Sequence, residues 1–173
     1  MRNDSLNVLF LCTGNSGRSI MAEAILNKLG FPRFSAYSAG SRPAEKVHPV
    51  AIELLESLHY PTSTLRSKSW LDFTYMSSPD FDLVIAVCDN PASELCQAWP
   101  GDPVRAHWKL PDPALVSGSP VDQLKAFSQV YQELERRIRH LVDLPHGTFD
   151  RNIVTRHLEE IEGTTMQAIE RQS

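Results

Sequence analysis

The 173-residue chain has few cysteines, no long apolar run and no excess of basic residues, and each absence excludes a class of protein. Three cysteines, an odd number, do not suit a structural disulfide framework and favour reactive thiols. The apolar run near the N-terminus is too short for a signal sequence or a membrane span, and no later run is long enough. A net charge of −4 implies no basic face for nucleic acid. We therefore expect a cytoplasmic protein that binds neither nucleic acid nor membrane.

The most informative stretch is residues 7–23, NVLFLCTGNSGRSIMAE. Its first five residues form a short run of branched and aromatic side chains, which predicts a buried strand. From Ser19 onward, apolar residues recur at four-residue spacing, as in an amphipathic helix. Cys12 is thus expected at the C-terminal end of a strand, with a tight loop and a helix N-terminus facing it.

This arrangement predicts an anion cradle around Cys12. Loop N–H groups and the positive end of the helix dipole favour a tetrahedral oxyanion, and the residues expected to surround it are Thr13, Gly14, Asn15, Ser16, Gly17 and Arg18. The same field, with Arg18 and the Ser19 hydroxyl nearby, favours a thiolate at Cys12. A thiolate beside a bound oxyanion is a nucleophile aimed at its central atom. The alternative is a buried cysteine followed by a glycine turn, the commoner fate of such a residue.

Further segments alternate between strand and helix patterns. We expect strands over 34–39, 81–87 and 104–108, and helices over 49–58, 92–98, 121–142 and 150–170, the last interrupted by Gly163. Residues 62–78 are harder to assign, and a short helix beside the mouth of the site is the interpretation we favour.

Strands that alternate with helices predict an α/β fold with a parallel sheet and right-handed crossovers. We expect four strands in the order 2-1-3-4, flavodoxin-like, with helices on both faces, over residues 1–145. Residues 146–173 would form a C-terminal helical extension. Ligands in such a sheet bind beyond the carboxyl ends of strands 1 and 3, and these strands end at Cys12 and Cys88. Two cysteines are therefore expected at one mouth.

Four segments together carry a resemblance to a known family: CTGNSGRSIMAE, SAGSRPAEKVHPVAIELL, VIAVCDNPASELC and AHWKLPDPA. The first resembles the phosphate-binding loop of low-molecular-weight protein tyrosine phosphatases and of the arsenate reductases built on the same fold. The others resemble the arsenate reductase branch. The resemblance runs from Asn7 to about Leu144. It implies that Cys12 is the nucleophile, that Arg18 clamps the oxyanion, and that Asn15 and Ser19 hold the loop and support the thiolate.

The resemblance also assigns a general acid. Asp112, before Pro113, would protonate the leaving oxygen, which requires a carboxyl group within hydrogen-bond reach of the oxyanion. From the residues alone, a plain Asp-Pro turn is the favoured interpretation of Asp112. His48 precedes a helix that starts at Pro49, and a role at the helix start or in the loop is favoured over catalysis.

The same resemblance implies a relay of thiols. After Cys12 attacks arsenate, Cys88 would attack Cys12 and release arsenite, and Cys96 would then form a Cys88–Cys96 disulfide that an external reductant opens. That reductant is thioredoxin or a glutathione/glutaredoxin pair, and no prosthetic cofactor is expected. Some relatives bind potassium beside the loop, where Asn15 and Glu23 match. Because Lys68 could replace the ion, no metal is expected.

Two other functions remain open. A phosphotyrosine phosphatase would use Cys12 without a second thiol, but such enzymes usually carry aromatic residues after the Asp-Pro, where this chain has Ala114-Leu115-Val116. A non-enzymatic oxyanion sensor is the third class. It would not need Cys12, Cys88 and Cys96 in relay, since function has to be argued from the site.

Overall fold

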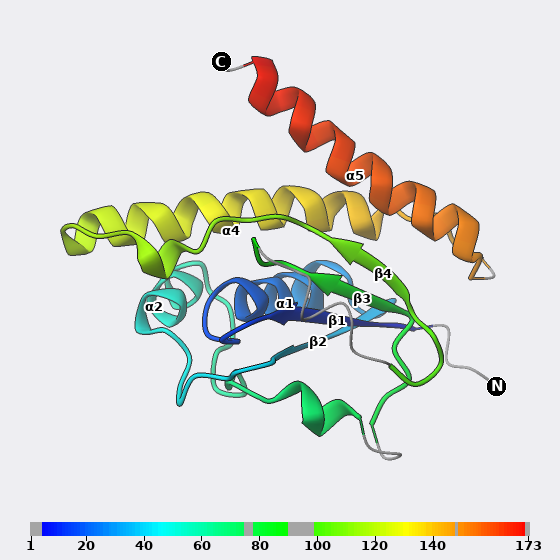
Figure 1. The fold of residues 1–173 in the computed structure, drawn as a ribbon, viewed down its shortest axis with the longest axis horizontal. Helices are drawn as coiled ribbons and strands as arrows, with labels where there is room; N and C mark the ends of the chain where they lie inside the picture. Colours follow the sequence, from blue (N-terminus) through cyan, green and yellow to red (C-terminus); the bar gives the residue numbers. More distant parts are fainter. Residues whose placement is uncertain (1–4, 75–77, 90–98, 148, 172–173) are drawn as a thin grey trace.

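The computed structural model describes residues 5–74, 78–89, 99–147 and 149–171. Four parallel strands form one sheet in the order β2-β1-β3-β4, which confirms the predicted topology (Figure 1). The strands are β1 (Leu6–Cys12), β2 (Phe34–Gly40), β3 (Leu83–Ala86) and β4 (Val104–His107). β1 lies at the centre, and its last residue, Cys12, pairs with Gly40 at the end of β2.

The described α-helices are α1 (Arg18–Leu29), α2 (Pro49–Ser57), α4 (Pro120–Val142) and α5 (Arg151–Arg171). Two 3-10 helices, η1 (Trp70–Phe73) and η2 (Pro113–Leu115), lie in the connections. Sequence signals explain where the helices begin. Ser119 and Asp122 form a reciprocal capping box at the start of α4, and His48 caps α2 ahead of its first-turn proline. The predicted helix-start role of His48 is confirmed.

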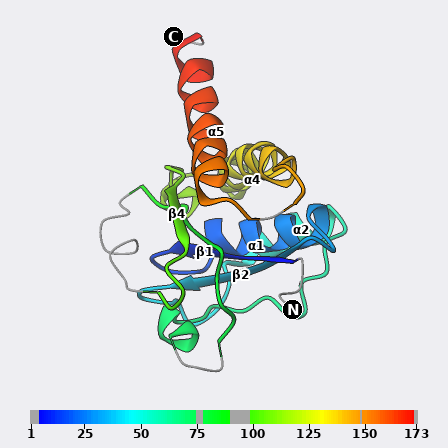
Figure 2. The same cartoon turned by 90° about the vertical axis from the view of Figure 1, so that its right-hand side faces the viewer.

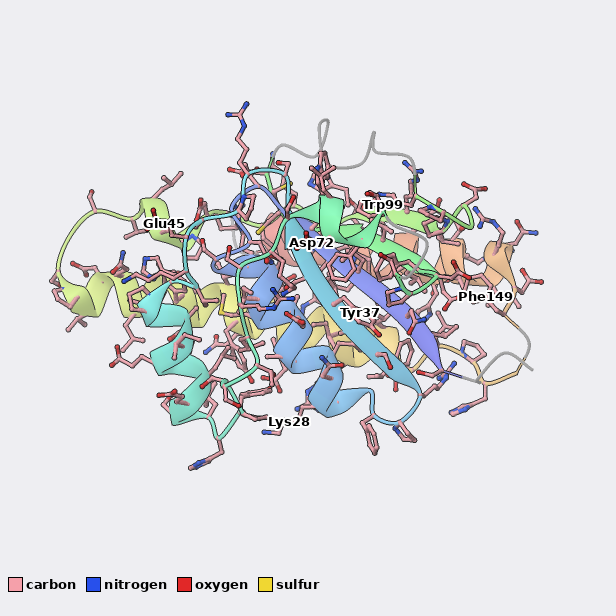
Figure 3. All side chains as sticks on the ribbon, turned by 90° about the horizontal axis from the view of Figure 1, so that it is seen from below. Lys28, Tyr37, Glu45, Asp72, Trp99 and Phe149 are labelled. Atoms are coloured by element: carbon pink, nitrogen blue, oxygen red, sulfur yellow. The ribbon has the colours of Figure 1, made fainter. Side chains whose placement is uncertain are left out.

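The sheet separates two apolar cores because its side chains alternate between faces. Val8 and Phe10 of β1 join the larger core, together with apolar side chains of α1, α2, α4 and α5. Leu9 and Leu11 point the other way, into a smaller core beside η1. Figure 3 shows this second face, where Tyr37 of β2 packs edge-on against Phe73 of η1. The described α-helices therefore cover one face, and the 3-10 helix η1 covers part of the other.

Two local expectations change, and a third is not tested. β3 spans only Leu83–Ala86, shorter than the apolar run 81–87. Gly163 does not interrupt the last helix, because α5 continues through it to Arg171. A single glycine in a helix costs only about 1 kcal/mol, which neighbouring turns and packing can offset. The helix expected over 92–98 lies outside the described residues.

The C-terminal helix α5 is attached to the body through its first half. Val154, Leu158 and Ile161 are buried in the larger core, and α5 lies against β4 and α4. Figures 1 and 2 show its C-terminal end projecting away from the sheet. Among the described residues, we find no helix with the length and apolar character needed to cross a membrane.

Candidate oxyanion site at the end of the central strand

The loop between β1 and α1 is hydrogen-bonded, through its carbonyl groups, to the chain segment that follows β2. Backbone N–H groups of Arg42, Ala44 and His48 donate to the carbonyls of Thr13, Gly14 and Ser16, each at 2.9 Å. Since the C=O and N–H of a trans peptide point in opposite directions, the N–H groups of Gly14 and Gly17 turn away from this outer segment. Both glycines line the adjoining cavity. This orientation supports the predicted anion cradle, which stays a proposal.

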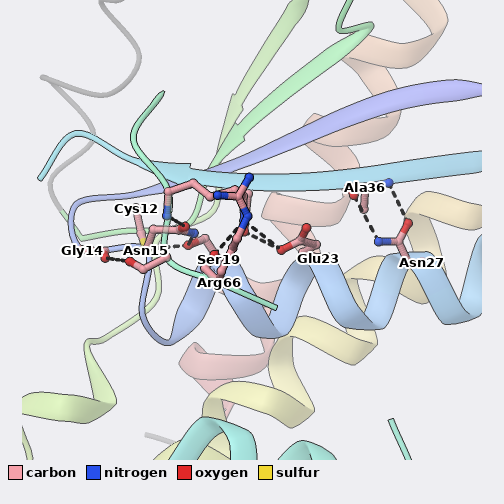
Figure 4. Close-up of polar contacts among 11 residues, drawn as sticks. Cys12, Gly14, Asn15, Ser19, Glu23, Asn27, Ala36 and Arg66 are labelled. Carbon is pink, nitrogen blue, oxygen red and sulfur yellow. Dashed lines mark hydrogen bonds and ion pairs between the residues drawn. The ribbon is translucent and has the colours of Figure 1, made fainter. Parts of the chain in front are cut away.

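A chain of buried polar contacts leads to the cysteine sulfur (Figure 4). The Sγ of Cys12 lies 2.8 Å from the Oγ of Ser19, and Asn15 donates from Nδ2 to the same oxygen at 2.8 Å. Because the Asn15 amide occupies an acceptor position of that hydroxyl, the hydroxyl hydrogen is left to point at sulfur. The backbone N–H of Lys68 donates to Asn15 Oδ1 at 2.8 Å and so fixes the amide. These contacts support the roles expected of Asn15 and Ser19.

Asn15 is also the strained residue of the loop. Its φ of 44° lies in the left-handed region, which asparagine tolerates better than most residues. Its side chain is fully buried, and both ends of its amide are hydrogen-bonded within the site. The side-chain contacts thus stabilise the backbone conformation that turns the loop.

A buried ion pair lies behind the loop. The Lys68 ammonium is 3.7 Å from Glu23 Oε2 and also donates to the Arg66 carbonyl, and Ser38 donates to the same Glu23 oxygen. Burial raises the pKa of Glu23, and the Lys68 ammonium opposes that rise. Burial lowers the pKa of Lys68, and Glu23 opposes that shift. The Lys68 ammonium thus places a positive charge beside Glu23. Within the described residues, no cluster of three or more His, Cys, Asp or Glu side chains could hold a metal ion.

Gly40 allows β2 to pass directly beside the loop. A Cβ atom there would lie 2.5 Å from the carbonyl oxygen of Thr13 and 2.8 Å from that of Cys12. Both neighbours are backbone atoms, so neither can rotate aside. The sequence places a glycine directly after the strand expected over 34–39, but its close approach to the loop follows from the pairing of Cys12 with Gly40.

Arg18 provides the positive charge of the site and is almost fully buried. Its Nη1 donates to Asp89 Oδ1 at 3.1 Å and to the Leu110 carbonyl at 3.0 Å, and its Nη2 lies 3.4 Å from Asp112 Oδ2. The guanidinium lines the same cavity as Cys12. A planar group with several N–H donors suits the bidentate binding of an oxyanion.

Asp112 performs two roles. Its Oδ1 accepts from the Ala114 N–H and caps η2, as the plain turn interpretation required, while Oδ2 faces Arg18. Its carboxyl group lines the cavity, where a general acid would have to lie.

His48 lies close to the loop, but its ring is used for other contacts. Its Nδ1 accepts from the Val50 N–H, and the ring packs against Phe127. Burial lowers the pKa of His48, and the charge of Asp112 opposes that shift.

Cys88 is 2% exposed and follows β3, the strand beside β1. The β1–β3 ladder extends past β3, because the Val87 N–H donates to the Leu11 carbonyl at 2.8 Å. The Nε2 of His107 contacts the Cys88 carbonyl at 2.5 Å. The next residue, Asp89, reaches the cavity that Cys12 lines. Both strands thus direct residues toward one mouth, while Cys96 lies outside the described residues.

The cavity measures about 300 Å³ and is lined by Cys12, Thr13, Gly14, Ser16, Gly17, Arg18, Asp89, Asp112, Ala114, Leu115 and Phe127. Two of these residues, Asp89 and Phe127, were not predicted as site residues from the sequence. Asp89 could have been found, because it directly follows a strand end at the expected ligand edge. Phe127 could not, because it reads as one position in the apolar stripe of α4. It is buried, and among the described residues that line the cavity it is the only aromatic side chain.

Residues 7–154 match the family model of low molecular weight phosphotyrosine protein phosphatases. The arsenate reductase of Halalkalibacterium halodurans is 33% identical over 132 residues, which cover 76% of this chain and 91% of that protein. The solved arsenate reductase of Archaeoglobus fulgidus has a TM-score of 0.62 at 29% identity and covers 79% of this chain and 98% of its own. A low molecular weight protein tyrosine phosphatase from T. tengcongensis has a TM-score of 0.63 at 26% identity, covering 80% and 99%. With this site and these matches, the chain belongs to the low molecular weight phosphotyrosine protein phosphatase family.

Proposed function

We propose that this protein reduces arsenate to arsenite with its own thiols, in the cytoplasm, and so serves arsenic detoxification. The observation that carries the proposal is the position of Cys12 in an anion cradle, beside Arg18, at the mouth toward which the Cys88 strand also leads. The relatives named as arsenate reductases support the choice of substrate. A hydrolytic enzyme would need the first of these thiols alone.

The first step is nucleophilic attack. The thiolate of Cys12 forms a bond to arsenic, and one arsenate oxygen leaves as water after it accepts a proton from Asp112. Arg18 and the loop N–H groups balance the charge on the remaining oxygens. Arsenic is still pentavalent, because substitution alone transfers no electrons.

The second step is the reduction. The Cys88 thiolate attacks Cys12 Sγ, the sulfur–sulfur bond forms, and the electron pair of the sulfur–arsenic bond stays on arsenic, which leaves as arsenite. Two thiols have then lost two electrons to arsenic. Cys96 attacks Cys88 in the resulting disulfide, releases the Cys12 thiolate, and leaves a Cys88–Cys96 disulfide for an external dithiol to open.

The external reductant is proposed to be thioredoxin or a glutathione/glutaredoxin pair. Arsenite production should be measured with each system supplied alone, for the unaltered protein and for Cys12→Ser, Cys88→Ser and Cys96→Ser variants. Cys12→Ser and Cys88→Ser should abolish turnover with both systems. A Cys96→Ser variant that keeps turnover only with glutathione would identify glutathione as able to open the Cys12–Cys88 bond. Full turnover by Cys88→Ser would contradict the relay.

Phosphotyrosine hydrolysis is the second candidate, and the similarity to a bacterial protein tyrosine phosphatase favours it. Its first step would be the same attack by Cys12, and water would then complete the cycle. After the Asp-Pro, however, where such enzymes usually carry aromatic residues, the cavity is lined by Ala114 and Leu115, and its aromatic side chain among the described residues is Phe127 of α4. We therefore expect slow hydrolysis of aryl phosphates. The Cys88→Ser variant should hydrolyse them at the same rate as the unaltered protein.

A further inference from the structure

Arg18 is held by acidic residues through both of its terminal nitrogens, and these N–H groups are donors that a bound oxyanion could also use. Its Nη1 binds Asp89 at 3.1 Å, and its Nη2 lies 3.4 Å from Asp112. An oxyanion carries two negative charges near neutral pH and enters a cavity that both carboxylates line. It must therefore compete with at least one of them for the guanidinium, since like charges that share one cavity repel.

Asp89 is the partner that can yield. Its side chain is 54% exposed, against 29% for Asp112, so its carboxylate can turn into water with little loss of solvation. Asp112 is also fixed by the Ala114 N–H at the start of η2. The hydrogen bond from Arg18 lowers the pKa of Asp89, so the competing group is charged at neutral pH. The Leu110 carbonyl remains on Nη1 at 3.0 Å and would keep Arg18 in place when Asp89 leaves.

Displacing Asp89 would also affect the second cysteine. The contacts of the Cys88–Asp89 segment include His107 at the Cys88 carbonyl and Arg18 at the Asp89 carboxylate. Cys88 itself is 2% exposed and cannot react with another sulfur without some opening of this segment. Release of the Asp89 contact removes the restraint that ties this segment to Arg18.

We propose that Asp89 is a competing counter-ion of the oxyanion site, and that its displacement by a bound oxyanion makes the Cys88 thiol accessible. The inference rests on the proposed oxyanion site at Cys12. It adds a positioning role for a residue that does not itself react. Such coupling would keep the second thiol covered until the substrate is bound, because the same guanidinium holds either the carboxylate or the oxyanion.

The test uses inorganic phosphate as a non-reducible oxyanion and the full-length reduced protein. Alkylation by iodoacetamide is followed at each cysteine separately by peptide mass spectrometry over a range of phosphate concentrations. Protection of Cys12 gives the affinity of the oxyanion site, and the rate at Cys88 gives its accessibility. The variants are Asp89→Asn, which removes the charge at nearly constant shape, and Asp89→Glu, which keeps it. Asp80→Asn is the matched control, because Asp80 is exposed before β3, at the opposite edge of the sheet.

In the unaltered protein, phosphate should slow alkylation of Cys12 and speed alkylation of Cys88 with the same midpoint. Asp89→Asn should lower the midpoint about fivefold, the ratio expected when a half-exposed ion pair no longer competes, and Cys88 should react rapidly without phosphate. Asp89→Glu and Asp80→Asn should stay within about twofold of the unaltered protein, since neither removes the charge that pairs with Arg18.

Two results would overturn the inference and leave the proposed function standing. One is phosphate protection of Cys12 with the same or weaker affinity in Asp89→Asn. The other is a Cys88 rate that phosphate does not raise in the unaltered protein. If phosphate protects Cys12 neither in the unaltered protein nor in any of the variants, the oxyanion site does not exist, and the proposed function fails with it.

Discussion

The sulfur of Cys12 depends on a single hydroxyl for its nearest polar contact in the described site. Ser19 is fully buried, lies 2.8 Å from that sulfur and accepts from Asn15. The geometry lets Ser19 stabilise the thiolate by donating its hydrogen, a contact that strengthens as negative charge gathers on sulfur.

Ser19→Ala removes this donor and leaves the Asn15 amide without its acceptor. We expect the rate constant of the first turnover with arsenate to fall about a hundredfold, the scale found when one charge-stabilising donor is deleted. Single-turnover kinetics at saturating arsenate would measure it. Ser57→Ala, at a hydroxyl that bonds only a carbonyl of its own helix α2, is the control and should react at the normal rate. Equal rates for both variants would mean that the Ser19 hydroxyl does not assist sulfur.

Gly40→Ala tests whether the cradle depends on the close approach of β2. The added methyl group would meet two backbone oxygens at 2.5 and 2.8 Å, so either the loop or the strand must move. We expect a loss of about 1–3 kcal/mol in the free energy of unfolding, as in other overpacked sites, and weaker phosphate binding.

Gly163→Ala is the matched control for that substitution. A Cβ there would meet nothing within 4 Å, and Gly163 lies inside α5. The same chemical change should therefore raise stability by up to about 1 kcal/mol, because alanine favours the helix. Urea unfolding of both variants gives the comparison. A neutral Gly40→Ala would show that the loop does not need this strand so close.

At the scale of elements, α4 carries a charged pair on its core-facing side. Arg137 is 4% exposed and donates to Glu133 at 2.7 Å. Its guanidinium lies over the ring of Trp108. Burial disfavours the Glu133 carboxylate, but hydrogen bonds from Arg136 and Arg137 outweigh it and lower the pKa of Glu133 to about 2.

The stabilisation by this pair should depend on pH in a defined direction. Glu133 has a pKa of about 2 in the folded protein against an ordinary value of 4.5, so the unfolded chain takes up the proton first as pH falls. The contribution is complete above pH 4.5 and is lost toward pH 2. Glu133→Gln should cost about 2 kcal/mol at pH 7, less than for a fully buried pair because Glu133 is 28% exposed.

Unfolding of Glu133→Gln and the unaltered protein should therefore be compared at several pH values, and the difference should shrink below pH 4. Glu135→Gln provides the control, since Glu135 is 28% exposed like Glu133 but its partner Arg139 is 62% exposed, so the pair is screened by water on the arginine side. A constant difference between pH 7 and pH 3 would contradict the assignment.

The elements also show which features the sequence could predict. β1, its loop and α1 follow from local patterns, because an apolar run of strand length meets a helical repeat with Cys12 between them. The Arg18–Asp89 contact joins residues 71 positions apart, so it depends on strand order and side-chain direction together. The break expected at Gly163 is wrong, because a single glycine costs a helix only about 1 kcal/mol and α5 runs through it.

At the scale of the whole molecule, α5 extends the family domain. The family match ends at residue 154, whereas α5 begins at Arg151 and runs to Arg171. A division between a domain over 1–145 and an extension over 146–173 stays a proposal. The buried side chains of α5 show that the first half of this helix packs onto the body.

Leu158→Ala measures what this packing contributes. Leu158 is 3% exposed in the larger core, and its truncation should cost about 2 kcal/mol, the lower end of the range for buried leucine. Ile153→Ala, at a side chain 47% exposed on the same helix, should change stability by no more than about 0.5 kcal/mol. Thermal or urea unfolding gives both values. Similar small losses would mean that α5 adds no stability to the domain.

The central claim is that Cys12 starts a redox relay instead of a hydrolytic cycle. Reduced protein should be mixed with arsenate without external reductant, and both the arsenite released and the disulfides formed should be measured. The account predicts one arsenite per protein molecule and a Cys88–Cys96 disulfide. Release of no arsenite and formation of no disulfide, together with rapid hydrolysis of phosphotyrosine by the same preparation, would contradict it.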